Sequence, residues 1–276
     1  MRYQEIQPNA AAARFVRAYW ILEDDDPFRV HRIVPDGRAQ LILNLGRPYE
    51  ACADGVWTRQ PQCFLIGQIT GPLMLRSSGA VRMIGLTFHP HTAGRLLNVP
   101  IGELTDKAVS VDDISRDLHR LVQEIETPDQ AGALDGMVLS LAKRAGREDG
   151  VLAGAVGEVE SGGTLLSVEE IARQAGLSAR QFERRFRQAV GIPPKLFSRM
   201  QRFQRVFAAL EGARTGWADA AIRCGYYDQA HLIRDFREFA GKPPAVLLSE
   251  ESDLARDFVQ RTKVSHFSNP RAGASR

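Results

Sequence analysis

The sequence predicts an α+β fold, in which an N-terminal antiparallel β domain with flanking helices precedes an all-α domain of two helix-turn-helix units joined by a long helix. Three observations lead to this prediction. Short β-rich runs separated by turn residues fill residues 14–90. Apolar residues at helical spacing dominate the chain after Pro90. Within that second part, one helical unit recurs with a period of 50 residues.

Charge is divided unevenly between the two parts. Residues 1–163 contain 17 Lys/Arg against 21 Asp/Glu, whereas residues 164–249 contain 14 against 8. An acidic front part and a basic back part predict two domains, of which the second faces a polyanion. We expect one domain at 1–150, a second domain at 151–249 and a disordered tail at 250–276.

Cysteine usage and hydropathy indicate the compartment. Cys52, Cys63 and Cys224 lie far apart in the chain, without the paired spacing of a disulfide framework. The first nine residues are polar, unlike a signal peptide. No run approaches the roughly 18 apolar residues of a membrane-spanning helix. We therefore expect a soluble, cytoplasmic protein with no membrane partner.

Turn residues divide the front part into strands. A Pro-Asp-Gly turn at 35–37 separates two β-rich runs, and further breaks fall at Gly67, at 71–72 and at 77–79. Strands of this length and spacing predict an antiparallel sandwich or barrel. Joints are expected at 146–150 and 161–164.

Two helices are expected behind these strands, at about 111–125 and 128–147. The first carries a long apolar stripe. This stripe leaves two alternatives open, because it could pair two subunits or pack on the sheet of its own domain.

The repeat lies in the back part of the chain. A helix cap, two apolar residues, a glycine stop and a Pro-Pro restart recur in the same order. The first copy comprises Ser178, Phe182, Phe186, Gly191, Pro193 and Pro194, and the second comprises Asp228, Leu232, Phe236, Gly241, Pro243 and Pro244. A long helix at about 194–211 joins the two helix-turn-helix units. At about 1.5 Å per residue, it could hold their second helices roughly one DNA turn, about 34 Å, apart.

The second helix of the first unit carries an outward stripe of charged residues. At about 100° per residue, the stripe comprises Arg180, Glu183, Arg184 and Arg187. Arginine donates bidentately to guanine and a carboxylate can accept from cytosine, so this stripe suits the edges of bases in a major groove. Arg185 lies to one side and suits a phosphate.

The matching positions of the second unit are Ala230, Ile233, Arg234 and Arg237. Ala230 and Ile233 can touch only a thymine methyl group, so we expect the first unit to discriminate sequence more strongly. The alternative for both helices is a basic face that is merely solvated. The repeat, the turn residues and the local charge together favour DNA.

The stretches SVEEIARQAGLSARQFERRFRQAVGIPPKLFSRMQRFQRVFAAL and WADAAIRCGYYDQAHLIRDFREFAGKPP resemble the DNA-binding domain of the arabinose-operon regulator family (AraC/XylS). The resemblance covers about 165–248 and implies two helix-turn-helix units joined by a long helix. It implies base-reading roles for Arg180, Glu183, Arg184, Gln229, Ala230, Ile233 and Arg234. The front part resembles the cupin-like sensor domain of some members. That resemblance implies effector binding or dimerisation, without identifying the effector.

Other chemistry was weighed and found weak. His89 and His91, with His31 as a third ligand, resemble a cupin metal site that lacks its carboxylate. The acidic run Asp24–Asp26 is expected to be a solvated loop. The sequence offers no catalytic residue, phosphate loop or paired cysteine motif, so we expect no metal and no cofactor and name no cofactor-binding residue.

We therefore expect a one-component transcription regulator that binds promoter DNA in successive major grooves. A small-molecule effector, RNA polymerase and a second subunit are its expected partners. Two alternatives remain open. One is a cupin-type metal-dependent enzyme or metal sensor with a DNA-binding tether, and the other is a regulator that works through protein contacts without an effector. The effector, the operator and the sign of regulation are not readable from the sequence.

Overall fold

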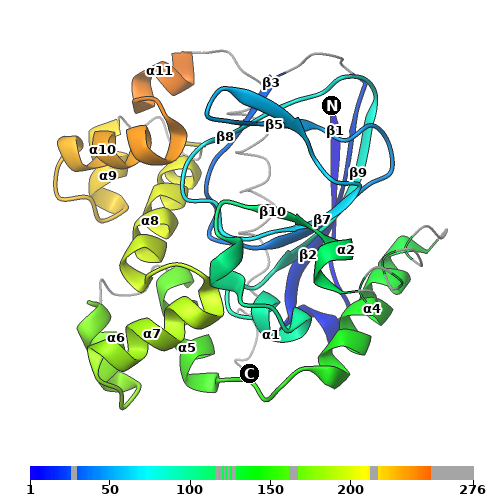
Figure 1. Ribbon diagram of the computed structural model, residues 1–276. Coiled ribbons are helices and arrows are strands. Elements are labelled where there is room, and N and C mark those ends of the chain that lie inside the picture. The colour runs from blue at the N-terminus through cyan, green and yellow to red at the C-terminus, as the bar shows by residue number, and fades with distance from the viewer. Residues whose placement is uncertain are drawn as a thin grey trace, which may run out of the picture.

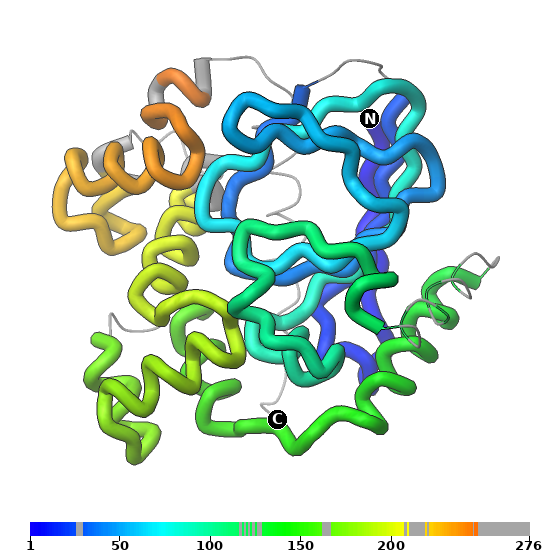
Figure 2. Tube along the Cα trace, viewed as in Figure 1, coloured from blue at the N-terminus to red at the C-terminus, as the bar shows by residue number. Residues whose placement is uncertain are grey.

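The computed structural model describes residues 1–25, 30–115, 118, 120, 122, 125, 129–161, 167–211 and 217–249. They form a β domain and a helical domain that lie side by side (Figures 1 and 2). The tail expected at 250–276 lies outside the described residues, as does the joint expected at 161–164 apart from Ser161.

The β domain consists of two antiparallel sheets, which confirms the β part of the predicted fold class. The larger sheet has the strand order β1-β2-β9-β4-β7-β10, and the smaller has the order β3-β8-β5-β6. The larger sheet is formed by β1 (Arg2–Ile6), β2 (Val16–Asp24), β4 (Gln40–Asn44), β7 (Cys63–Ile66), β9 (Val81–Phe88) and β10 (Ala108–Ser110). The smaller sheet is formed by β3 (Val30–Ile33), β5 (Glu50–Ala53), β6 (Val56–Arg59) and β8 (Leu73–Arg76).

The Pro-Asp-Gly turn carries the chain from one sheet to the other. It follows β3, which pairs with β8, and precedes β4, which pairs with β7 and β9. Gly37 in this turn has a φ of 78°, a left-handed conformation that favours glycine. The turn is therefore a sheet crossing rather than a hairpin, and it projects toward the helical domain.

Helices pack against the larger sheet, where α1 (Ala93–Leu97), α2 (Val111–Ile114) and α4 (Gln130–Arg144) are found. The single helix expected at 111–125 is wrong, because Ser115 is extended and ends α2. Its apolar residues Leu118, Val122 and Ile125 are buried in the core of their own domain. The structure thus favours packing on the sheet over subunit pairing for these side chains.

The helical domain contains α5 (Gly150–Ser161), α6 (Val168–Gln174), α7 (Ala179–Val190), α8 (Pro194–Glu211), α9 (Trp217–Arg223), α10 (Gln229–Ala240) and α11 (Pro244–Ser249). The predicted caps are confirmed: the side chains of Ser178 and Asp228 accept hydrogen bonds from backbone N–H groups at the starts of α7 and α10. Gly191 and Gly241 end these helices in left-handed conformations. Helix α5 was not predicted, because its glycines lower its helix propensity.

Helix α8 holds the two repeat units together (Figures 1 and 2). Toward its start, the ring of Phe197 lies 5.5 Å from that of Phe186 on α7. One turn and a half later, the ring of Phe203 lies 4.8 Å from Phe236 and 5.3 Å from Phe239, both on α10. One helix therefore fixes the positions of both α7 and α10.

Replacing Phe203 with alanine should destabilise the helical domain. Phe203 is fully buried, and truncation of a buried phenylalanine costs about 3–5 kcal/mol. Urea unfolding followed by circular dichroism at 222 nm measures this loss. Tyr227→Ala is the matched control, because Tyr227 is 93% exposed and should change the free energy of unfolding by less than about 0.5 kcal/mol. Equal effects of the two substitutions would contradict the packing described here.

Candidate functional site

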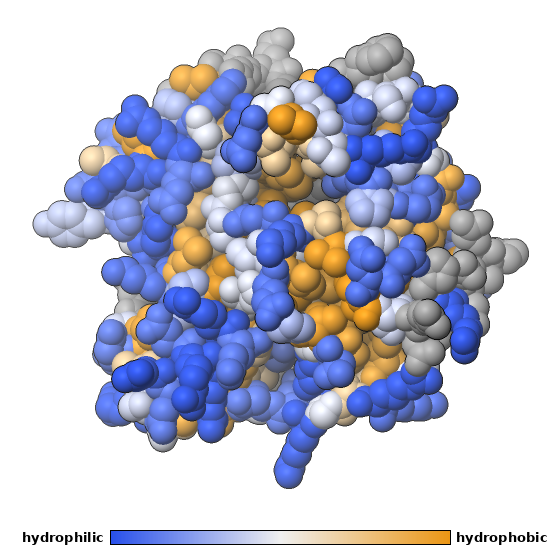
Figure 3. Space-filling model, viewed as in Figure 1, coloured by the Kyte–Doolittle hydropathy of each residue, from blue (hydrophilic) through white to orange (hydrophobic). Residues whose placement is uncertain are grey.

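Helices α7 and α10 present the predicted stripes to solvent. On α7 the exposed residues include Arg180, Glu183, Arg184, Arg185 and Arg187. On α10 the side chains of Gln229, Ala230, Arg234 and Arg237 are exposed, and that of Ile233 is half-buried. Phe182, Phe186, Leu232 and Phe236 are buried on the opposite sides. Figure 3 shows hydrophilic side chains over the outer surface of the helical domain, including the region of α6 and α7.

Local ion pairs on α7 involve two of its arginines. The Arg187 guanidinium lies 3.6 Å from the Glu183 carboxylate, one turn earlier. Arg185 lies 3.8 Å from Asp149, just before α5. Exposed pairs of this kind contribute little to stability, so they compete weakly with a phosphate or a base.

A buried ion pair orients α10 on α8, and sequence reasoning missed it. Arg199 on α8 contacts Asp235 at 2.7 Å and Glu238 at 2.5 Å, both on α10. Hydrogen bonds from these carboxylates, chiefly that of Glu238, hold the pKa of Arg199 above its usual range. Asp235 is 1% exposed, so removing Arg199 would leave a buried charge uncompensated. The pattern could not reveal this pair, because its members lie on different helices.

A cavity of about 470 Å³ lies where the β domain meets the helical domain. The two sheets supply an apolar wall that includes Trp20, Leu22, Ile42, Phe64, Leu75 and Met83. Polar residues from the β domain and from α5 and α8 complete the lining, among them Arg17, Asp36, Arg38, Glu160, Gln201 and Arg205. An enclosed apolar wall with a few polar groups is typical of small-molecule sites.

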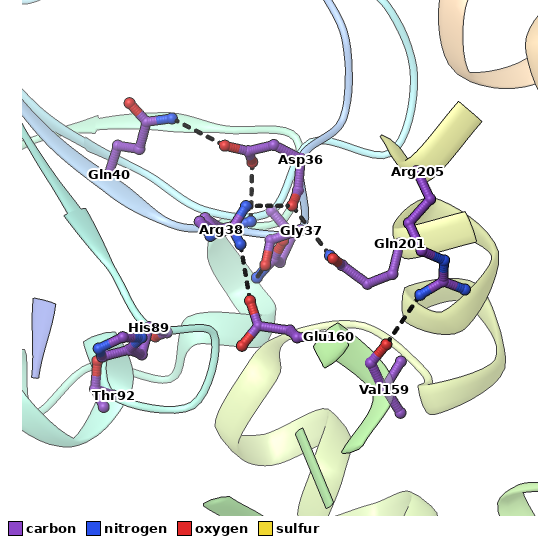
Figure 4. Close-up of polar contacts among 11 residues, drawn as sticks. Asp36, Gly37, Arg38, Gln40, His89, Thr92, Val159, Glu160, Gln201 and Arg205 are labelled. Carbon is purple, nitrogen blue, oxygen red and sulfur yellow. Dashed lines mark hydrogen bonds and ion pairs between the residues drawn. The ribbon is translucent and has the colours of Figure 1, made fainter. Parts of the chain in front are cut away.

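The polar side of this cavity is also the junction between the domains (Figure 4). Arg38 Nη2 donates to Glu160 Oε1 on α5 at 2.8 Å. Gln201 on α8 donates to the Asp36 carbonyl at 3.1 Å, and Gln204 donates to the Pro35 carbonyl. The sheet-crossing turn is thus held by two helices of the other domain.

Burial shapes the ionisation of the groups around the junction. Desolvation lowers the pKa of Arg17 to about 10, and the neighbouring charge of Arg38 adds to this effect. Desolvation also raises the pKa of Asp36, although Arg38 acts in the opposite direction. The junction therefore concentrates charged groups in a region of low solvation.

Comparison with known families and structures places these features. Residues 171–250 match a family model described as a helix-turn-helix domain, and residues 4–110 match one described as a domain of unknown function. A search of curated protein sequences finds no match. The match at 171–250 spans α6 to α11, the two units packed around α8.

The chain is a transcription regulator of the AraC/XylS family.

Solved structures of similar fold include ToxT from Vibrio cholerae, which is 10% identical, with a TM-score of 0.47 over 85% of this chain and 98% of that one. The DNA-binding domain of the transcriptional factor AdpA, in complex with a target DNA, is 31% identical over 36% of this chain and 89% of that one, with a TM-score of 0.34. The AraC-like transcriptional activator CuxR is 17% identical, with a TM-score of 0.28 over 76% and 88% of the two chains.

The structure does not bring the three histidines of the regulator together. His89 Nε2 donates to the Ala13 carbonyl at 2.9 Å, and His91 lies 3.5 Å from Glu148. His31 is buried in another part of the β domain. Among the described residues, no group of three or more His, Cys, Asp and Glu side chains is arranged to hold a metal ion.

The expectation of a solvated loop at Asp24–Asp26 is wrong for Asp24, while Asp26 lies outside the described residues. Asp24 ends β2 and is fully buried. Its carboxylate lies 3.1 Å from His31 Nε2 and accepts a hydrogen bond from Tyr49 at 3.3 Å. The acidic run looked like a loop because a strand that carries a buried, paired carboxylate has no distinctive pattern.

The described helices of the regulator do not include one that is long and apolar enough to span a bilayer.

The glycines that end α7 and α10 both dock on the β domain. Thr105 Oγ1 donates to the Gly191 carbonyl at 3.2 Å. Arg32 donates to the carbonyl of Ala240, the residue before Gly241, at 2.8 Å. The β domain therefore contacts the two repeat units at equivalent ends.

Gly191→Ala should destabilise the regulator more than Gly176→Ala. Both glycines have positive φ, and alanine in that conformation costs about 1–2 kcal/mol. A Cβ at Gly191 would also lie 3.2 Å from the Ile101 carbonyl, whereas one at Gly176 meets nothing within 4 Å. We expect an additional loss of about 1 kcal/mol or more from this overpacking. Urea unfolding measures both variants, and equal losses would argue against close docking at Gly191.

Proposed function

We propose that the regulator inserts α7 and α10 into successive major grooves of promoter DNA. The exposed stripe of Arg180, Glu183 and Arg184 supports base reading by α7, because these groups match donors and acceptors on base edges. The second stripe offers Arg234 and Arg237 beside apolar neighbours, which supports a weaker base preference for α10. Arg185 and Arg187 suit phosphates. The remaining predicted position, Gln229, lies at the start of α10, where an amide can meet a base or the backbone.

We further propose that the cavity binds a small-molecule effector. The observation that carries this proposal is that the cavity shares α8 with the DNA-reading unit: Gln201 and Arg205 line the cavity, while Phe197 and Phe203 support α7 and α10. A ligand there would touch both domains. In this proposal the chain catalyses no reaction and acts in the cytoplasm beside RNA polymerase, as a homodimer.

Arg184→Ala should weaken DNA binding at one base pair. If Arg184 reads guanine, the loss is about 1–3 kcal/mol on the preferred operator and much smaller on operators changed at that base pair. A fluorescence-anisotropy titration across single-base operator variants measures this. Lys143→Ala is the matched control, because it removes an exposed cation from α4 in the β domain. A uniform loss across all variants would assign Arg184 to phosphate instead.

Arg185→Ala should lower affinity for every operator variant by a similar factor. One lost phosphate contact reduces the slope of log affinity against log salt by about 1. Titrations at several salt concentrations give this slope for the wild type and the variant. An unchanged slope with a base-specific loss would contradict the phosphate role.

A further inference from the structure

The lining of the cavity carries an excess of positive charge. Four arginines and three carboxylic acids contribute to it. The arginines are Arg17, Arg32, Arg38 and Arg205, and the acids are Glu5, Asp36 and Glu160. Burial raises the pKa of Glu5 and that of Asp36, which favours the neutral form of both acids and increases the excess. A monoanion would restore the balance.

The guanidinium of Arg38 has one bidentate edge that its present partner uses only in part. Its Nη2 donates to Glu160, and its Nη1 donates to the Asp36 carbonyl at 3.2 Å. Its Nε is buried and has no hydrogen-bond partner among the described residues. Nε and Nη2 together form the fork that a carboxylate binds most strongly, with two parallel hydrogen bonds. A buried donor left without a partner is unfavourable by about 1–3 kcal/mol.

A second polar group inside the cavity also lacks a partner. Gln60 is 7% exposed and lines the cavity, and its Oε1 accepts no hydrogen bond from the described residues. Apolar side chains, among them Ile42 and Phe64, contribute to the same wall. A ligand with an apolar body would therefore match the greater part of this lining, and a charged head would match the arginine side.

We propose that the cavity binds an apolar organic carboxylate, whose head group takes the Nε–Nη2 edge of Arg38 from Glu160. This inference rests on the proposed role of the cavity as the effector site. Glu160 lies on α5, so the exchange breaks an ion pair between the two domains. Helix α5 keeps its contact with α8, where Arg205 donates to the Val159 carbonyl at 3.3 Å. Ligand binding is thereby converted into release of the helical domain from the sheet-crossing turn.

Three ligands with one body and different heads test the ligand class. Isothermal titration calorimetry of the full chain compares 4-phenylbutyrate, 4-phenylbutanol and 4-phenylbutylamine. The same three heads on an octyl chain repeat the comparison for a flexible body. We expect the carboxylates to bind at least about tenfold more tightly than the alcohols and amines, as for a charge-assisted bidentate contact. Alcohols that bind as tightly as the carboxylates would overturn the ligand class while leaving the cavity as an effector site.

Glu160→Gln tests the exchange. Because this substitution weakens the competitor for Arg38, carboxylate affinity should rise several-fold while alcohol affinity stays unchanged. Glu158→Gln is the matched control, since Glu158 is exposed on the same helix and should leave all affinities unchanged. Arg38→Gln should remove the preference for carboxylates.

The outcomes separate the two proposals. Weaker carboxylate binding by Glu160→Gln would show that Glu160 does not compete, and would overturn the exchange. Absence of binding by all six compounds would overturn the cavity as an effector site and the inference with it, whereas operator binding by the free chain would be unaffected. If Arg38→Gln fails to fold, the comparison of the two glutamate variants, whose melting temperatures are measured alongside, still decides.

Discussion

The architecture depends on the packing of a single helix, α8. Its phenylalanines Phe197 and Phe203 each enter the core of a different repeat unit. Neither unit is large enough to bury its own apolar face without that shared support. The ion pair of Arg199 with the buried Asp235 then orients α10 on the same helix. The relative placement of the two DNA-reading helices is therefore a property of α8 rather than of a flexible connection.

The other side of α8 faces the cavity and the β domain. There the contacts are polar: Gln201 and Gln204 donate to carbonyl groups of the turn, and Arg38 pairs with Glu160. Polar interdomain contacts are weaker than a continuous apolar core, and domain motion across them is the default expectation. An apolar core that fixes the reading helices, next to a polar junction that can rearrange, suits a protein whose DNA affinity responds to a ligand.

Much of the helical domain could be predicted because its signals are local. A serine or aspartate cap and a glycine stop lie within one helix of each other, and their repetition after 50 residues makes chance agreement improbable. The antiparallel β domain was predicted for a similar reason, from strand length and turn residues. Helix α5 was missed since its glycines obscure the helical pattern.

The cavity could not be predicted, because its groups come together only in the tertiary fold. Arg38 and Glu160 are separated by 122 positions and lie in different domains. Asp24 was misassigned for the same reason, as its partners His31 and Tyr49 come from other parts of the chain. A pattern in one sequence records which residues share a face, but it does not record which faces meet.

The central claim is that α8 holds two reading helices on one duplex. Hydroxyl-radical footprinting of the full chain on its operator tests this most directly. The account predicts two protected segments on the same face of the DNA, separated by about 10–10.5 base pairs, one for each recognition helix. A single protected segment of half that extent, unchanged at saturating protein, would contradict it.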